Sequence, residues 1–312
     1  MKKIISLIIA FTFIIACLTL SSCGKKAAGD EGKLKITTTV FPPYDFARQI
    51  AGENAEIKML VPPESESHSF EPSLTDLSVI YNSDIFIYAG GDSEEWVKDI
   101  AENAAEKGVL TLAMTDCTEL IYKKGHEHDS DHSHTVQEID EHVWTTPNNA
   151  ILICEKIKEL MCQKDEKNTE IYNANYDRYK AELEALHNEF TGVIQDATTK
   201  TLVFEGRCPF AYFCKEYGLV CHSAIDGCSS NTEVGLTTVS ELIGIVKEQN
   251  IPAVLYIELS NQEIADTICK STGAKKLFLH SCHCISKEEI ESGATYISLM
   301  KNNVETVREA LG

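Results

Sequence analysis

Histidines at widely separated positions are the residues of this chain best suited to bind a metal ion. His68, His142, His280 and His283 lie in segments expected to be loops that follow strands or precede a helix. Neutral imidazole is the commonest protein ligand for zinc-like cations, and parallel α/β sheets bind ligands beyond the carboxyl ends of their strands. The pattern predicts one metal site formed by His68, His142 and His280, with His283 as an additional or replacement ligand.

A second group of histidines lies between residues 125 and 135, where imidazoles alternate with acidic side chains. The segment contains His126, His128, His132 and His134. Two interpretations remain open, a polar loop that binds no metal and a flexible auxiliary loop that collects zinc near the main site. Imidazole-rich sites favour zinc, whereas manganese prefers oxygen ligands. Zinc (Zn2+) is therefore the expected ion, and manganese (Mn2+) is less favoured.

The N-terminal segment has the features of an export signal that ends in a lipidation site. Two lysines precede an apolar run, and residues 20–23, Leu-Ser-Ser-Cys, resemble the lipobox of bacterial lipoproteins. We expect residues 1–23 to be a signal peptide with lipid on Cys23, and residues 24–33 to be a flexible tether. An ordinary signal peptide or a transmembrane helix is the alternative, although the run is short for a span. The prediction is an exported protein, lipid-anchored on the outer face of the cytoplasmic membrane.

The charge of the chain argues against one large class of partners. The formal net charge is −20, and it becomes −22 without residues 1–23, which contain two lysines and no acidic residue. Nucleic-acid binding requires a basic face, so we expect no nucleic-acid partner.

The cysteine content leaves the disulfide pattern open. Ten of the 12 cysteines remain when Cys17 and Cys23 are set aside. Disulfides are permitted outside the cytoplasm, but a sequence does not determine their pairing.

Short apolar runs alternate with amphipathic segments in both halves of the chain. This alternation predicts an α/β fold with parallel sheets. Strands are expected at residues 34–40, 56–61, 85–88, 109–113, 201–204, 220–224, 253–257 and 276–279. Helices are expected at residues 43–51, 75–81, 93–105, 209–217, 237–248 and 261–271, near Pro147, and from about 294 onward.

One apolar seam with a 4-3-4-3 spacing predicts a long helix over residues 164–199. We interpret this helix as a rigid link between two α/β lobes, residues 34–163 and residues 200–312. A coiled-coil dimer is the alternative use of the same seam, and a monomer is the expectation. The seam residues are Tyr172, Tyr176, Tyr179, Leu183, Leu186, Phe190 and Val193.

Several motifs together resemble the zinc and manganese receptors of bacterial ABC importers. Residues 63–72, Pro-Glu-Ser-Glu-Ser-His-Ser-Phe-Glu-Pro, are similar to the first ligand loop of that family. Residues 140–144, Asp-Glu-His-Val-Trp, are similar to its second ligand motif. Further segments resemble those that carry the third ligand and flank the fourth: residues 209–219, 272–275 and 296–300. The similarity extends over roughly residues 34–312 and rests on the order and spacing of the motifs.

The resemblance implies two similar lobes, each a parallel sheet flanked by helices, with the metal in the cleft between them. It implies an extracytoplasmic receptor that captures zinc and delivers it to an ABC permease in the membrane. A manganese- or iron-type receptor of the same family and a surface adhesin with the same fold are the alternatives. A zinc hydrolase would also use histidine ligands, but the sequence contains no His-Glu-x-x-His motif and no Gly-x-Ser-x-Gly elbow. We therefore expect a receptor and not an enzyme.

The sequence departs from the family pattern at two ligand positions. Arg207 stands where the third ligand, His or Glu, is expected, and an arginine cannot lose its proton to bind a metal. His280 stands where the fourth ligand is usually a carboxylate. Glu205 would point to the same side of a strand end as Arg207, so it could supply an oxygen, or Arg207 could pair with a nearby acid. Three histidines and a water would still satisfy zinc.

Overall fold

The computed structural model describes residues 32–91, 94, 96–124, 137–225 and 234–312. The expected signal peptide with Cys23, most of the expected tether and the histidine-rich segment from His126 to His134 lie outside the described residues. Residues Leu34–Gly312 form one folded unit. Among the described residues, no helix is both long and apolar enough to cross a membrane.

The first sheet contains four parallel strands in the order β2-β1-β3-β4. Because β1 pairs with β2 on one side and with β3 on the other, the chain moves outward from β1 to β2 and then crosses back over β1 to β3, as in doubly wound sheets. The strands are β1 (Leu34–Thr38), β2 (Ala55–Met59), β3 (Ile85–Tyr88) and β4 (Leu110–Ala113). The helices between them are α2 (Phe41–Ala51), α3 (Leu74–Tyr81) and α4 (Val97–Glu106).

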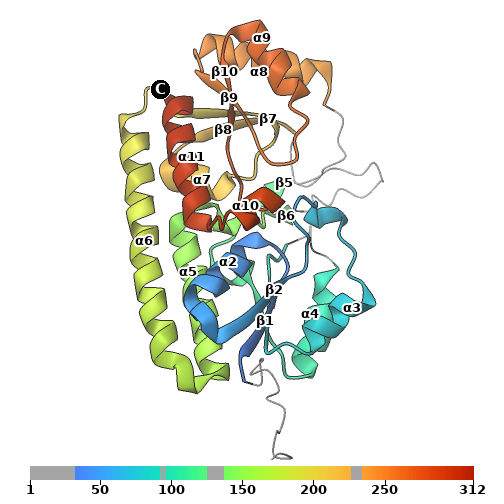
Figure 1. Cartoon of the computed structure of the whole chain (residues 1–312). Coiled ribbons are helices and arrows are strands. Elements are labelled where there is room, and N and C mark those ends of the chain that lie inside the picture. Colours follow the sequence, from blue (N-terminus) through green and yellow to red (C-terminus); the bar gives the residue numbers. More distant parts are fainter. Residues whose placement is uncertain (1–31, 92–93, 95, 125–136, 226–233) are drawn as a thin grey trace, which may run out of the picture. The chain divides into compact units, whose positions relative to one another are not determined.

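The second sheet repeats this topology, with four parallel strands in the order β10-β9-β7-β8 (Figure 1). In both sheets the first strand of the lobe lies between the second and the third. Two similar α/β lobes are therefore confirmed. The strands are β7 (Thr201–Arg207), β8 (Val220–Ile225), β9 (Ala253–Tyr256) and β10 (Lys275–Phe278). The helices are α7 (Ala211–Tyr217), α8 (Leu236–Glu248), α9 (Glu263–Thr272), α10 (Lys287–Glu291) and α11 (Tyr296–Leu311).

The sequence prediction missed one small sheet next to the histidine-rich segment. Strands β5 (Tyr122–Lys124) and β6 (Gln137–Ile139) pair antiparallel, with Tyr122 opposite Ile139. Strands of three residues with two polar members each, Tyr-Lys-Lys and Gln-Glu-Ile, carry no readable apolar alternation. The position of this hairpin matters because β6 leads directly into the loop that contains His142.

The long helix begins later than the sequence predicts. Helix α5 (Pro147–Lys164) ends at Asp165, a 3-10 turn follows over Glu166–Asn168, and α6 (Thr169–Asp196) then runs for 28 residues. The hydroxyl of Tyr172 donates to Asp165 at 2.7 Å and fixes the reversal. At about 1.5 Å per residue, α6 is about 42 Å long. It runs beside α5 along the first lobe and continues beside α11 along the second (Figure 1).

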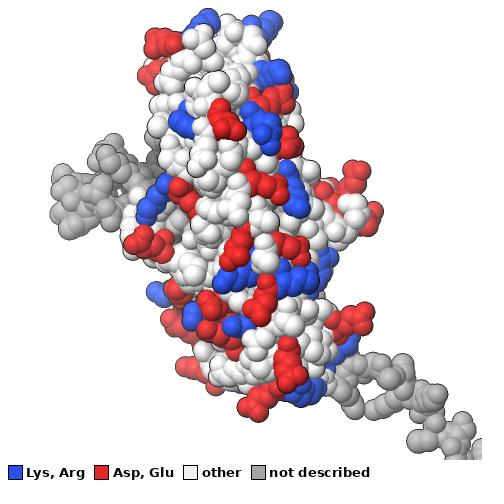
Figure 2. Space-filling model, turned by 90° about the vertical axis from the view of Figure 1, so that its left-hand side faces the viewer, with Lys and Arg blue, Asp and Glu red and all other residues white. Residues whose placement is uncertain are grey.

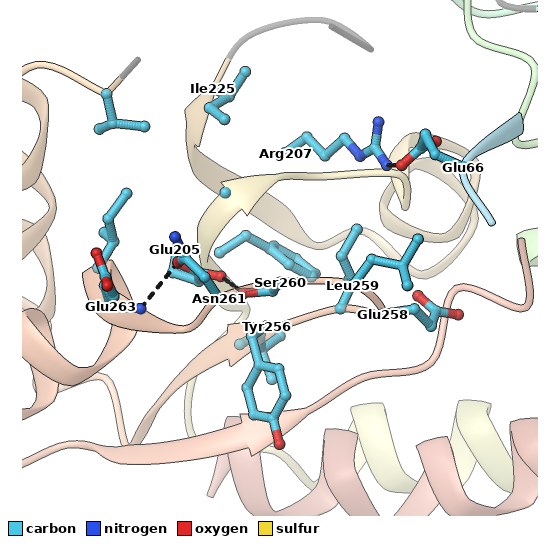
Figure 3. A pocket seen from close by; sticks show the side chains of 16 residues that line it. Glu66, Glu205, Arg207, Ile225, Tyr256, Glu258, Leu259, Ser260, Asn261 and Glu263 are labelled. Atoms are coloured by element: carbon cyan, nitrogen blue, oxygen red, sulfur yellow. Dashed lines mark hydrogen bonds and ion pairs between the residues drawn. The ribbon is translucent and has the colours of Figure 1, made fainter. Parts of the chain in front are cut away.

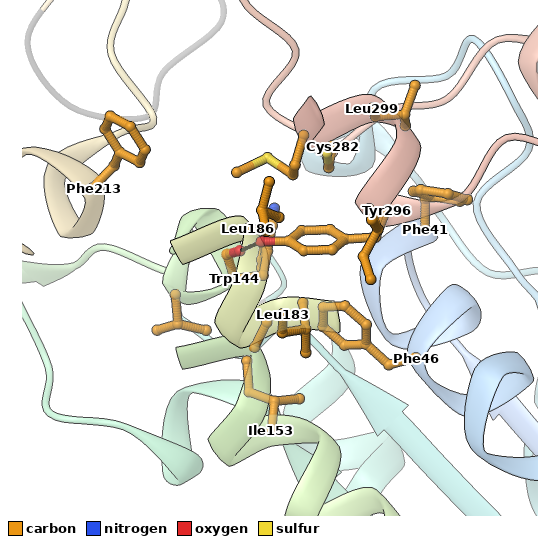
Figure 4. Packing of buried hydrophobic residues seen from close by; sticks show 14 of the residues in the cluster. Phe41, Phe46, Trp144, Ile153, Leu183, Leu186, Phe213, Cys282, Tyr296 and Leu299 are labelled. Atoms are coloured by element: carbon orange, nitrogen blue, oxygen red, sulfur yellow. Dashed lines mark hydrogen bonds between the residues drawn. The ribbon is translucent and has the colours of Figure 1, made fainter. Parts of the chain in front are cut away.

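The apolar seam of α6 faces the interior of the same chain. All seven predicted seam residues are buried and belong to one core that also contains residues of both sheets. Leu183 and Leu186 pack near Phe46 of α2 and Tyr296 of α11 (Figure 4). The seam therefore joins the two lobes within one chain and is not the free face that a coiled-coil dimer would need.

Charged side chains of both signs cover the surface. On the face shown in Figure 2, acidic and basic residues are interspersed over both ends of the folded unit.

Candidate metal centre

His68 lies in the loop that connects β2 to α3. A 3-10 turn over Ser67–Ser69 orients the residue, and its Nδ1 lies 2.6 Å from Oε1 of Glu66. When Nδ1–H donates to a carboxylate, Nε2 of the neutral ring keeps a free lone pair that can bind a metal. Metal-binding histidines usually have this arrangement. The Nε2 atom lies 3.3 Å from Oε1 of Glu141.

His142 is held by the same type of contact from a different element. It precedes a 3-10 turn, Val143–Thr145, between β6 and α5. Its Nδ1 lies 2.8 Å from Oδ1 of Asp140, and its backbone N–H donates to the same oxygen at 3.0 Å. The residue is only 2 % exposed. The carboxylate of Asp140 therefore fixes both the ring orientation and the tautomer of His142.

His283 reaches these two rings from the second lobe. It lies in the loop between β10 and α10 and is 6 % exposed. Its Nε2 lies 2.7 Å from the hydroxyl of Ser67, the neighbour of His68. Trp144 secures the contact, because its Nε1 donates to the carbonyl of Ser281 at 2.9 Å and its ring packs against His283.

The rings of His68, His142 and His283 are here called the histidine cluster, and that of His283 lies at a metal-sharing separation from each of the other two. The ring centroids of His283 and His68 are 5.6 Å apart, and those of His283 and His142 are 5.2 Å apart. Imidazoles bound to one tetrahedral zinc with bonds near 2.0 Å have centroids about 5 Å apart. The three rings could therefore bind one ion with small rotations of their side chains.

Small rotations are needed because the ring nitrogens have other partners in this structure. In the described part of the chain, no group of three or more His, Cys, Asp or Glu side chains is already positioned to hold a metal ion. The Ser67 hydroxyl occupies Nε2 of His283, so coordination through that nitrogen would replace one hydrogen bond.

Burial and neighbouring charges keep the His283 ring neutral and the Glu66 carboxyl ionised, and both protonation states favour cation binding. Burial, followed by the charges of His142 and His68, lowers the pKa of His283 to about 3, so this ring is neutral at physiological pH. Burial alone would raise the pKa of Glu66, but the hydrogen bond with His68 and the charge of Arg207 lower it to about 2. Neutral nitrogens backed by ionised carboxylates form a donor set that suits zinc.

The ring of His280 contacts two carboxylates of the second lobe. Its Nδ1 lies 2.5 Å from Oε1 of Glu258, and its Nε2 lies 3.2 Å from Oε1 of Glu289. Burial alone would lower its pKa, but these carboxylates and a bond from Cys282 raise it well above the usual histidine value. The backbone N–H of Cys282 also donates to Nδ1 at 2.9 Å, so a ligand role for His280 through Nε2 stays a prediction.

Glu205 and Arg207 lie at the end of β7, where they line a cavity of about 680 Å³ (Figure 3). Glu205 accepts a hydrogen bond from the hydroxyl of Ser260. Arg207 pairs with Glu66, with 2.7 Å between Nη2 and Oε2. The structure thus pairs Arg207 with a nearby acid. This was one of the two alternatives left open by the sequence, and the other was that Glu205 supplies an oxygen ligand. The sequence analysis did not single out Glu66, Asp140 or Ser67, although each lies within two residues of a predicted ligand.

The sequence left open whether the cysteines form disulfides, and the structure describes most of them. Among the described residues, the structure forms no disulfide bond at Cys117, Cys154, Cys162, Cys214, Cys221, Cys269, Cys282 or Cys284. Cys282 and Cys284 flank His283. Burial raises the pKa of both thiols, that of Cys284 to about 12, so they are protonated at neutral pH.

Comparison with protein families gives one match over nearly the whole described chain. Residues 36–310 match the family described as "Zinc-uptake complex component A periplasmic". The matched range contains the histidine cluster and both sheets.

Individual relatives agree with this match. The zinc-binding lipoprotein AdcA of Streptococcus pneumoniae is 31 % identical over 313 residues, which is 99 % of this chain and 61 % of the relative. The chain thus spans about three fifths of the curated relatives that it matches first. The crystal structure of the Zn(II)-bound ZnuA-like domain of Streptococcus pneumoniae AdcA has a TM-score of 0.76 and 28 % identity, over 90 % of this chain and 99 % of that domain.

A third relative connects the fold with a second activity. The laminin-binding protein of Streptococcus agalactiae, described as bifunctional with adhesin and metal-transporting activity, has a TM-score of 0.76 and 26 % identity. The similarity covers 89 % of this chain and 100 % of that structure.

Proposed function

Because the chain belongs to the zinc-uptake complex component A family, we propose that it is the receptor that captures zinc for a zinc-uptake complex. The observation that carries the proposal is the histidine cluster, in which loops of both lobes bring three imidazoles together. His68 and His142 come from the first lobe and His283 from the second. An ion bound by all three would therefore hold the lobes together.

The proposed ligand set is His68, His142 and His283, with a fourth position for water or a carboxylate. Zinc accepts three protein ligands and one further ligand, and Glu141 lies next to Nε2 of His68. Three nitrogens favour zinc over manganese. The ion is the cargo of the receptor and is not a catalytic centre, so we propose no enzymatic reaction.

The family match supports a permease partner and an extracytoplasmic location. We propose that the protein acts outside the cytoplasmic membrane as a monomer, delivers zinc to the ABC permease of the complex, and is anchored through lipid on Cys23. Laminin binding in the bifunctional relative accompanies metal transport, so adhesion would be an addition to zinc capture and not a replacement for it.

Zinc titration of the chain without residues 1–23, which keeps the whole folded unit, tests the function. We expect close to one tightly bound zinc and further zinc bound weakly by the segment from His126 to His134. Deletion of residues 126–134 should remove only the weak phase in calorimetry. A matched control replaces the four histidines of this segment by asparagine and keeps its length. Absence of a tight phase, or displacement of zinc by equimolar manganese, would contradict the proposal.

Zinc affinity is expected to decrease as the pH falls below about 7, because only neutral imidazole binds the ion. The pKa of His283 is about 3, so this ring stays neutral and cannot contribute to the decrease above about pH 4. His68 and His142 are then the remaining sources of competing protons in the cluster. The logarithm of the dissociation constant, measured against a calibrated chelator from pH 5 to 8, should change by at most two units per pH unit. A slope near three would show that His283 also titrates.

A further inference from the structure

Arg207 connects the second lobe to the first through an ion pair. Its Nη2 lies 2.7 Å from Oε2 of Glu66, a residue 141 positions earlier in the chain (Figure 3). Arg207 is the last residue of β7, and Glu66 lies in the loop that follows β2. The side chains are only 16 % and 19 % exposed, so solvent screens this pair less than it screens a surface ion pair.

The carboxylate of Glu66 extends this connection to the proposed zinc site. Its Oε2 contacts Arg207, and its Oε1 lies 2.6 Å from Nδ1 of His68. One rigid carboxylate therefore links the guanidinium of the second lobe to a proposed zinc ligand of the first. A movement that separates Arg207 from Glu66 would leave the carboxylate that contacts His68 without its cationic partner.

The backbone of β7 is shaped so that Arg207 can make this contact. The pairing of β7 with β8 shifts register between Phe204 and Arg207, and such irregularities redirect side chains at strand ends. Arg207 and Glu66 both line the cavity of about 680 Å³ beside β7 and β9. The ion pair thus forms one side of this cavity, where Glu66 of the first lobe meets residues of the second lobe.

We propose that Arg207 is a positioning residue that latches the two lobes through Glu66 and thereby slows the release of zinc from His68. The inference rests on the proposed function, because it assigns a role in zinc exchange. Breaking a largely buried ion pair by removing one partner leaves a poorly compensated charge and mainly increases dissociation rates.

The test measures zinc release from the chain without residues 1–23, by mixing the loaded protein with excess chelator in a stopped-flow instrument. Arg207→Gln is expected to release zinc about tenfold faster than the wild type. Arg207→Lys keeps the charge and should release zinc at an intermediate rate. The compact ammonium group of lysine holds a carboxylate less well than the planar guanidinium of arginine. Arg178→Gln breaks an exposed pair with Glu182 on α6 and, as the matched control, should stay within about twofold of the wild type.

A double-mutant cycle shows whether Arg207 acts through Glu66. Glu66→Gln should also release zinc faster, and adding Arg207→Gln to it should change the rate no further. The proposal is overturned if Arg207→Gln releases zinc at the wild-type rate or more slowly, or if the two effects multiply. If the wild type itself binds no zinc, the proposed function fails. If the wild type binds zinc tightly and the Arg207 variants behave like it, only the latch fails.

Discussion

Alanine at position 142 is expected to weaken zinc binding by about 10²–10³-fold, because it removes one of three nitrogen ligands. Structural zinc sites bind with roughly 10–16 kcal/mol, which is about 2.5–4 kcal/mol for each of four ligands. The ring of His142 is already oriented for metal binding, since Asp140 contacts both its Nδ1 and its backbone N–H. Competition with a chelator of known zinc affinity would measure the loss in the His142→Ala variant.

Two further variants separate ligand loss from damage to the fold. His142→Asn keeps a polar side chain in the buried position and should lose affinity to a similar extent, while a smaller cavity limits the loss of stability. His187→Ala is the matched control, because His187 lies on α6 and contacts Tyr217 and Glu216 away from the cluster. If His142→Ala and His142→Asn are both folded and bind zinc as tightly as the wild type, the proposed ligand set is wrong.

The architecture could be predicted from the sequence because it follows from local patterns. The alternation of apolar and amphipathic segments gave all eight strands of the two parallel sheets within a few residues of their observed bounds. The 4-3-4-3 spacing identified the buried face of α6, since this face must pack against both lobes. The end of α5 at Asp165 was missed because it depends on a turn that Tyr172 stabilises from the next helix.

The proposed metal ligands could be predicted only in part, because the choice between His280 and His283 depends on distant residues. Both lie in the loop after β10. Between them, Cys282 has a φ of 61°, an uncommon left-handed conformation that turns the chain sharply. Glu258, which follows β9, and Glu289 of α10 then pair with His280, while Ser67 of the other lobe contacts His283. No spacing within the loop itself contains this information.

Replacing His283 and His280 in turn is expected to give opposite results. His283→Ala should weaken zinc binding by about 10²-fold or more, because a neutral ligand from the second lobe is lost. His280→Ala should leave zinc affinity within about threefold, because its ring contacts Glu258 and Glu289 of its own lobe and lies outside the proposed ligand set. Its effect should appear in stability, where removing one partner of a buried ion pair costs about 3–5 kcal/mol.

Equilibrium zinc titration and urea unfolding of the same two variants would measure both effects. Zinc affinity should be determined well below the unfolding midpoint of each variant, and His280→Gln offers a milder replacement if His280→Ala does not fold. Unfolding of the metal-free proteins should then rank His280→Ala as the less stable variant, while zinc titration ranks His283→Ala as the weaker binder. The reverse ranking in both measurements would indicate that His280, and not His283, is the zinc ligand. It would also mean that the loop after β10 reorganises when zinc binds.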